Sequence, residues 1–174
     1  MFGNLKAFCG AVGVLLLTSV TLSAQPLDDA KKRQLAEDLV SEFWQRVWSP
    51  QSDLSAIDDL VVEDFVLTSA GNKVVGREAF TAWVKNFQGK AKDVKLKAFE
   101  TFSNSDASRV TSRWQADGFN NGVLGLKPDG RAISFTGIAI WEIRWTSDGP
   151  KLAQNWVERS AWELYQQLKK SDGE

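Results

Sequence analysis

GFNNGVLGLKPDGRAISFTGIAIWEIRW, residues Gly118–Trp145, joins a glycine-rich link to a long run of β-branched and aromatic residues. The run from Arg131 onward has the composition of a strand rather than a helix. A phosphate-binding loop is disfavoured, because Gly118, Gly122 and Gly125 have neither the G-x-G-x-x-G nor the G-x-x-x-x-G-K-[ST] spacing and open no helix. We therefore expect this link to bend and close a sheet.

The segments around this stretch change from a helical period to a period of two. Helices are expected over residues 28–48, through 58–60, from about 77 to 89, and over 161–170. Strands are expected over 61–68, 94–102, 109–117, 132–145 and 152–158. Helices followed by an antiparallel meander indicate an α+β domain with helices on one face of the sheet. Glycines such as Gly118, Gly122 and Gly137 are expected to let the sheet curve into a cone around a cavity.

The composition is that of one ordinary globular domain. The chain has 174 residues, of which 43% are hydrophobic and 25% charged, and its formal net charge is −1. Without an excess of positive charge, nucleic acid is not expected as a partner. All eight tryptophans follow residue 40, where large amphipathic rings could fill a core or line a pocket.

The first 24 residues, MFGNLKAFCGAVGVLLLTSVTLSA, have the features of a secretory signal peptide. One early cation, Lys6, precedes an apolar run, and small residues follow up to Ala24. The run over 7–22 is shorter than the roughly 20 residues that a spanning helix requires. We expect cleavage after Ala24, a single domain over 25–174, and an exported product, either periplasmic or secreted. Contact with a membrane is expected only in the alternative case of an uncleaved anchor.

Removal of the signal would leave a chain without cysteine or histidine, since Cys9 lies within it. Nucleophilic systems that depend on histidine or a thiolate are then excluded, as are imidazole and thiolate metal sites. We expect neither a cofactor nor a metal. Packing alone, without disulfides, must hold the exported domain together.

The order of elements and several local motifs resemble the SnoaL-like polyketide cyclases, or ester cyclases, of the nuclear transport factor 2-like superfamily. The resemblance covers roughly residues 39–168. Its motifs are GREAF at 76–80, RW at 113–114, GFNNG at 118–122, PDGR at 128–131, FTGIAI at 135–140, and Trp156 followed by Gln167-Leu168.

The resemblance implies a nuclear transport factor 2-like cone, in which N-terminal helices pack on a strongly curved antiparallel sheet and a C-terminal helix closes the domain. It also implies a deep apolar pocket, where an acidic residue near the end of the last strand assists aldol ring closure without a metal. In this sequence the acid position falls on Ser160, and the histidine of the family motif G-T-H falls on Asn120. Asn120 could donate a hydrogen bond to a carbonyl or enolate oxygen, but Ser160 needs a separate base to take a proton.

Glu158 is the nearest substitute for the missing acid. If the strand continues far enough, Trp156, Glu158 and Ser160 share one face, so that a carboxylate could enter the pocket. Asp117 is a second option, although its place in the alternation favours solvent. The alternatives are a solvated carboxylate at Glu158 and a turn-stabilising role for Asn120.

An aromatic set is expected to supply the pocket wall, with core packing as the alternative for each ring. Its members are Trp44, Phe65, Trp83, Trp114, Phe135 and Trp156. The first hypothesis is a metal-free cyclase or isomerase that acts on a small carbonyl compound, with Glu158, Asn120 and Ser160 as catalytic residues. The alternatives are a non-catalytic module that binds a small apolar molecule and an interaction domain that forms a homodimer through the open sheet face.

Overall fold

The computed structural model describes residues 27–169, so the predicted signal peptide at 1–24 lies outside the described residues. The elements, in chain order, are α1 (Asp29–Val47), α2 (Ala56–Leu60), β1 (Val61–Ser69), β2 (Asn72–Val75), α3 (Arg77–Lys90), β3 (Ala91–Ser103), β4 (Arg109–Asn120), the 3-10 turn η1 (Val123–Gly125), β5 (Ala132–Thr146), β6 (Gly149–Arg159) and α4 (Ala161–Lys169). Between residues 27 and 169, no helix is both long and apolar enough to cross a membrane.

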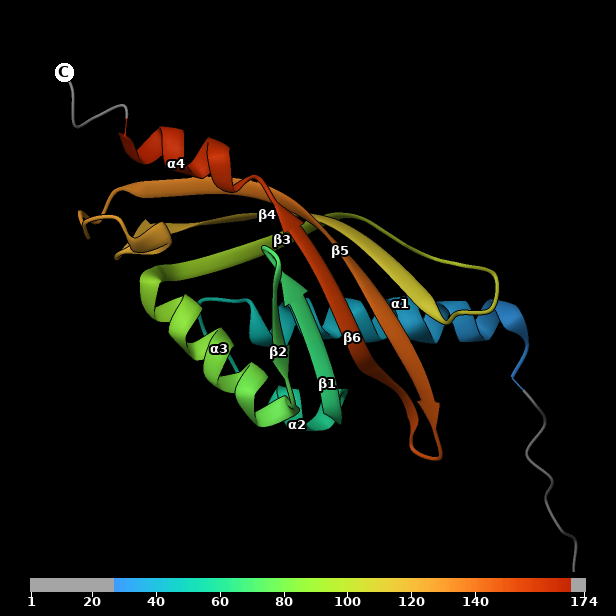
Figure 1. Cartoon of the computed structure of the whole chain (residues 1–174). Coiled ribbons are helices and arrows are strands. Elements are labelled where there is room, and N and C mark those ends of the chain that lie inside the picture. The colour runs from blue at the N-terminus through green and yellow to red at the C-terminus, as the bar shows by residue number, and fades with distance from the viewer. Residues whose placement is uncertain (1–26, 170–174) are drawn as a thin grey trace, which may run out of the picture.

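The strands form a single six-stranded sheet in the order β2-β1-β6-β5-β4-β3. Strands β3 to β6 are antiparallel neighbours, as the meander pattern predicts. Strand β1 pairs with β6 in parallel and with β2 antiparallel. Figure 1 shows the long strands β3 to β6 twisting strongly, with α1 and α3 on one side of them. The fold is therefore α+β, as expected, with one parallel pair in a mostly antiparallel sheet.

The two long helices present apolar faces to the inner side of this sheet. In α1 the buried positions Leu39, Val40, Phe43 and Val47 recur at helical spacing. Asp28 caps this helix by accepting a hydrogen bond from the Lys31 N–H at 2.7 Å. Burial of this apolar stripe positions α1 across the sheet, and its aromatic side chains reach the interior.

The centre of the core is a network of aromatic rings. Phe43 from α1 meets Trp141 of β5 edge to face at 4.9 Å and stacks with Phe80 of α3 at 6.1 Å. Phe65 of β1 approaches Phe80 at 4.6 Å. Because such pairs add favourable geometry to area burial, they fix the helices against the sheet without a disulfide.

Strand β3 has two register shifts, and the first of them lies opposite Gly118, one of the glycines at which the sequence suggested a bend. Register shifts occur in β3 between Lys92 and Lys95 and between Ala98 and Glu100. Gly118 and Gly137 both lie in an uninterrupted β4–β5 ladder, where the absence of a side chain leaves room for close neighbours. A Cβ on Gly118 would lie 2.8 Å from the Lys92 carbonyl oxygen. The two glycines therefore allow close packing of neighbouring strands, and further register shifts occur between β5 and β6 and between β1 and β6.

The sequence analysis did not find β2, which has only four residues, NKVV. Its hydrogen bonds come from pairing with β1, with Val66 opposite Val75 and Ser69 opposite Asn72. A strand this short gives too few alternations for a period to be recognised.

Candidate functional site

A cavity of about 40 Å³ lies between α1, α3 and the inner face of the sheet. Its wall is mostly aromatic, and four of the predicted pocket residues contribute to it: Trp44, Trp83, Trp114 and Phe135. The volume is sufficient for a few water molecules or a small chemical group. Larger occupants would require the lining side chains to move.

The other two predicted pocket residues do not line this cavity. Phe65 is fully buried in the core, where it packs against Phe80. Trp156 lies on the opposite, outer face of the sheet, where the Arg109 guanidinium lies 5.4 Å from its ring centre. The expectation that Trp156 lines the pocket is therefore wrong, and the core alternative describes Phe65.

The alternation along β6 runs opposite to the expected one. Asn155, Val157 and Arg159 face the cavity, whereas Glu158 is exposed on the outer face beside Arg113. The register explains this, since Leu67 and Ser69 are inward residues of β1 that pair with Asn155 and Val157. The expectation placed Trp156 on the inner face, and because side chains of a strand alternate, it placed the other residues of β6 on the wrong faces as well.

Ser160 lies between β6 and α4, outside the cavity lining. Its N–H donates to the Thr136 carbonyl at 2.9 Å, and its own carbonyl accepts from the Leu164 N–H at 3.2 Å. Asp117 is exposed on the sheet and accepts a hydrogen bond from Gln115 at 2.9 Å. Ser160 lines a shallow surface site together with Glu158, but neither Ser160 nor Asp117 shares a site with Asn120.

Asn120 is almost fully buried, but its side chain holds a loop together. Its amide nitrogen donates to the Lys127 carbonyl at 2.9 Å and to the Asp129 carboxylate at 2.8 Å. Its amide oxygen accepts from the N–H groups of Gly122 and Val123, each at 3.0 Å. These bonds connect β4, η1 and the Pro-Asp-Gly turn, so the turn-stabilising alternative describes the geometry of Asn120.

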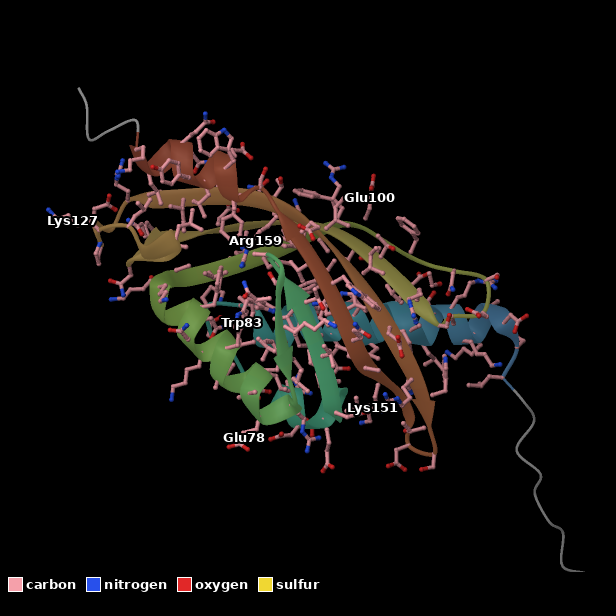
Figure 2. The ribbon with its side chains drawn as sticks, in the orientation of Figure 1. Glu78, Trp83, Glu100, Lys127, Lys151 and Arg159 are labelled. Atoms are coloured by element: carbon pink, nitrogen blue, oxygen red, sulfur yellow. The ribbon has the colours of Figure 1, made fainter. Side chains whose placement is uncertain are left out.

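The cationic residue of the cavity is Arg159, which the sequence analysis did not select. Its guanidinium lies 5.2 Å from the ring centre of Phe87 and 6.0 Å from that of Trp83. Figure 2 shows Arg159 and Trp83 together in the space between α3 and the sheet. Burial lowers the pKa of the Arg159 guanidinium, an effect that the charge of Glu158 partly offsets.

A model of the SnoaL-like polyketide cyclase family matches residues 38–168, which is most of the chain. This chain belongs to that family. The match includes all six strands, the cavity and α4 up to Leu168. It confirms the family that the motifs suggested.

Solved structures agree with this SnoaL-like fold. A SnoaL-like polyketide cyclase from Jannaschia sp. CCS1 is 12% identical, with a TM-score of 0.69, and the match covers 82% of this chain and 96% of that one. A polyketide cyclase from Xanthomonas campestris pv. campestris is 20% identical, with a TM-score of 0.67 and coverage of 78% and 98%. TsrD from Streptomyces laurentii is 23% identical, with a TM-score of 0.66 and coverage of 83% and 98%. The comparison with curated proteins found no match.

Two residues that line the cavity of this SnoaL-like protein, Asn155 and Trp114, each carry a buried polar atom without a partner. The Asn155 side-chain oxygen and the Trp114 indole nitrogen are both buried and make no hydrogen bond with the described residues. Leaving such groups unpaired costs free energy. An oxygen- or nitrogen-bearing occupant could satisfy both.

The cavity wall of this SnoaL-like protein contains no carboxylate among the described residues. Arginine remains protonated in proteins, and an amide or an indole N–H does not accept a proton readily. In the same described part of the chain, no group of His, Cys, Asp and Glu side chains could hold a metal ion. The geometry therefore provides apolar contact, hydrogen bonding and one positive charge, and offers no evident general base.

A second hollow, of about 290 Å³, lies toward α4 and η1. Trp83, Phe87, Phe135 and Arg159 line both spaces and therefore form a partition between them. The rest of the outer hollow is largely apolar, and Lys90 is its second cation. We call the two spaces the inner cavity and the outer hollow.

Proposed function

We propose that this SnoaL-like protein binds a small, largely apolar molecule between α1, α3 and the sheet and does not transform it. The observation that supports this proposal is the set of residues around the inner cavity: most are aromatic, none of those described is a carboxylate, and two of them, Asn155 and Trp114, carry buried polar atoms without a partner. Apolar walls with a few placed polar groups are typical of small-molecule sites. Catalysis of the family type would also need a group that accepts a proton.

Ligand entry in this proposal depends on the partition. The inner cavity of about 40 Å³ is smaller than the roughly 300 Å³ at the low end of ligand pockets. Trp83 and Phe87 are only partly buried, so a change of their side-chain rotamers could join the cavity to the outer hollow. Binding would then be accompanied by movement of two aromatic rings.

Tryptophan fluorescence provides the test, because Trp44, Trp83 and Trp114 line the inner cavity. Titration with octanol and octanamide should change the emission in a saturable way, whereas indole, which is itself fluorescent, is titrated by calorimetry. Chromatography of each mixture after long incubation should show the probe unchanged. The matched control is Trp83→Leu, which should weaken the response. Absence of saturable binding by calorimetry for all three probes would refute the proposal.

A metal-free cyclase or isomerase is the second candidate, and the family match supports it. It would require a small carbonyl compound to reach Glu158, which lies on the outer face with Arg113 and Ser160 around it. The test is turnover of a carbonyl substrate panel by the wild-type protein and by Glu158→Gln. Product formation that the substitution abolishes would favour catalysis over simple binding.

We also propose that the outer sheet face pairs with a second copy of this chain. Phe99, Phe102, Ile138 and Ile140 are exposed there, at 46%, 57%, 48% and 41%. Charged residues of both signs surround them, including Arg113 and Glu100 at 3.8 Å from each other, and Figure 2 shows Glu100 on the side away from α3. Such a mixture suits a self-complementary interface, and native mass spectrometry measures the oligomeric state.

Export completes the proposal, since the first 24 residues carry the pattern of a signal peptide. The expected mature chain begins at Gln25. Mass spectrometry of the protein recovered from an expressing bacterium would identify the N-terminus. An intact Met1 on the mature protein would contradict cleavage.

A further inference from the structure

Arg159 differs from every other arginine in the described part of the chain. A carboxylate lies within 4.0 Å of each of six other arginines: Arg46, Arg77, Arg109, Arg113, Arg131 and Arg144. The remaining one, Arg33, donates to the Ser105 carbonyl. Within residues 27–169, the backbone of Arg159 belongs to the β5–β6 ladder, but its side chain makes neither a hydrogen bond nor an ion pair. Its contacts of note are the faces of Phe87 and Trp83.

The neighbouring carboxylate compensates this charge only in part and makes no ion pair with it. Glu158 is the adjacent residue, but strand alternation places its side chain on the outer face of the sheet, where Arg113 and Arg159 line the same shallow surface site. The inner cavity and the outer hollow contain no other acidic residue from any described element that lines them. Cation–π contacts compensate only part of the free energy lost when a guanidinium leaves water. The site therefore favours an anion brought by a ligand.

The surroundings of the charge define the rest of that ligand. Arg159 lies in the partition, so an anion that binds it from the outer hollow has an apolar cavity on its other side. Lys90 adds a second positive charge at the rim of the outer hollow. The planar fork of a guanidinium matches a carboxylate with two parallel hydrogen bonds. A phosphate dianion fits less well, because most of the lining is apolar.

We propose that Arg159 is the anchor for an organic carboxylate, whose carboxylate group binds at the partition and whose apolar body lies between α3 and the sheet. This inference deepens the proposed function and rests on it. The expected ligand class is therefore small amphipathic monoanions with an aromatic or aliphatic body. Among the residues that line the cavity, the unpaired Asn155 side-chain oxygen could accept a hydrogen bond from a donor on that body, and the unpaired Trp114 N–H could donate one to an acceptor.

The experiment compares octanoate with its neutral analogue octanamide by isothermal titration calorimetry at neutral pH. A charge-assisted pair with Arg159 should make octanoate bind about 10-fold to 100-fold more tightly than octanamide. In Arg159→Met, which keeps an apolar stem of similar length, this difference should fall to about threefold or less. Octanamide binding by this variant shows that the site is still folded.

Arg113→Met is the matched control, because it removes the same charge from the outer face. It should retain the full preference for octanoate. Arg159→Lys should keep part of the preference, since charge remains but the bidentate geometry is lost.

The outcomes separate this inference from the proposed function. Equal affinity for octanoate and octanamide in the wild-type protein, or a preference that survives in Arg159→Met, would overturn the carboxylate anchor and leave apolar binding intact. Absence of binding by both probes, and by indole and octanol, would overturn the proposed function and the anchor together.

Discussion

Gly137→Ala tests how the wall of the inner cavity is built. A Cβ on Gly137 would lie 2.3 Å from Cζ2 of Trp114, 2.6 Å from Cη2 of the same ring and 2.6 Å from the Glu158 carbonyl oxygen. An ordinary contact begins at 3.4 Å, so the indole ring would have to move by about 1.1 Å, the difference between 3.4 and 2.3 Å. One added methyl group thus meets both a packed ring and the backbone of the adjacent strand.

The surroundings of Trp114 limit that movement. Its ring packs against Trp44 at 6.3 Å and against Phe135 at 6.0 Å, which leaves the inner cavity as the nearest free space. We expect Gly137→Ala to lower the free energy of unfolding by about 2–3 kcal/mol, within the range for overpacked cores. The displaced ring should also fill part of the cavity and weaken octanamide binding.

Urea denaturation monitored by circular dichroism measures the stability change. Gly89→Ala is the matched control, because Gly89 lies in α3 and a methyl group added there would have nothing within 4 Å. That substitution should stabilise the protein by about 0.5–1 kcal/mol through helix propensity. A loss of stability in Gly137→Ala no larger than about 0.5 kcal/mol would refute the role assigned to the glycine.

A double-mutant cycle identifies the ring as the cause. In Gly137→Ala combined with Trp114→Phe, the two close indole carbons are absent, so the combined loss should be smaller than the sum of the single losses by about 1 kcal/mol or more. Rescue should remain incomplete because the contact with the Glu158 carbonyl persists. Strict additivity would show that the backbone contact alone is responsible.

The other predictions concern the loop, the sheet face and α4. Asn120→Ala should lower the free energy of unfolding by about 2–3 kcal/mol in urea denaturation, because four hydrogen bonds disappear. Its affinity for octanamide should stay within threefold of the wild-type value. Loss of binding without loss of stability would contradict the structural role. The Arg131 N–H and the Asn120 amide lower the pKa of Asp129 to about 2 from 3.8. This carboxylate therefore stabilises the fold above about pH 4 and loses that effect as the pH falls toward 2. The difference in melting temperature between wild type and Asp129→Asn should shrink over that interval. A constant difference would show that ionisation of Asp129 does not affect stability. Ile140→Lys should convert the proposed dimer to a monomer in native mass spectrometry and change stability by less than about 1 kcal/mol; an unchanged mass would place any interface elsewhere. Gln167→Ala should raise light scattering on heating, because the Gln167 amide covers the Ser134 backbone in the first part of β5, which extends beyond the end of β6. Unchanged scattering would show that this part of β5 needs no protection.

Periodicity was sufficient to predict most of the fold. Each long helix and strand has several turns or alternations, so its apolar pattern identifies it, as in α1 and β5. The motifs also indicated the family that the match over residues 38–168 confirms. The parallel β1–β6 pair was not predicted, because it joins segments that are distant in sequence and share no local signal.

The site was harder to predict, because it depends on which face of β6 turns inward. Both faces of this strand carry apolar and charged residues, with Trp156 and Glu158 on one and Val157 and Arg159 on the other. The choice is made by the packing of β1 and α3 against β6, which a single sequence does not display. The alternation does place Arg159 on the same face of the strand as Val157 and Asn155. Once that face is known to turn inward, a positive charge inside the domain follows. Asn120 resembled a ligand residue in the motif, but its own loop uses its hydrogen bonds.

The central position of β6 has a consequence for the synthesis of this protein. Strands β1 and β2 lie on one side of β6, and β5, β4 and β3 lie on the other, so the two parts of the sheet join only through the last strand to leave the ribosome. A nascent chain that stops before Gly149 contains both parts but lacks the strand that connects them. Because N-terminal segments emerge first and distant pairings form slowly, the native sheet cannot be completed during translation until Arg159 has emerged.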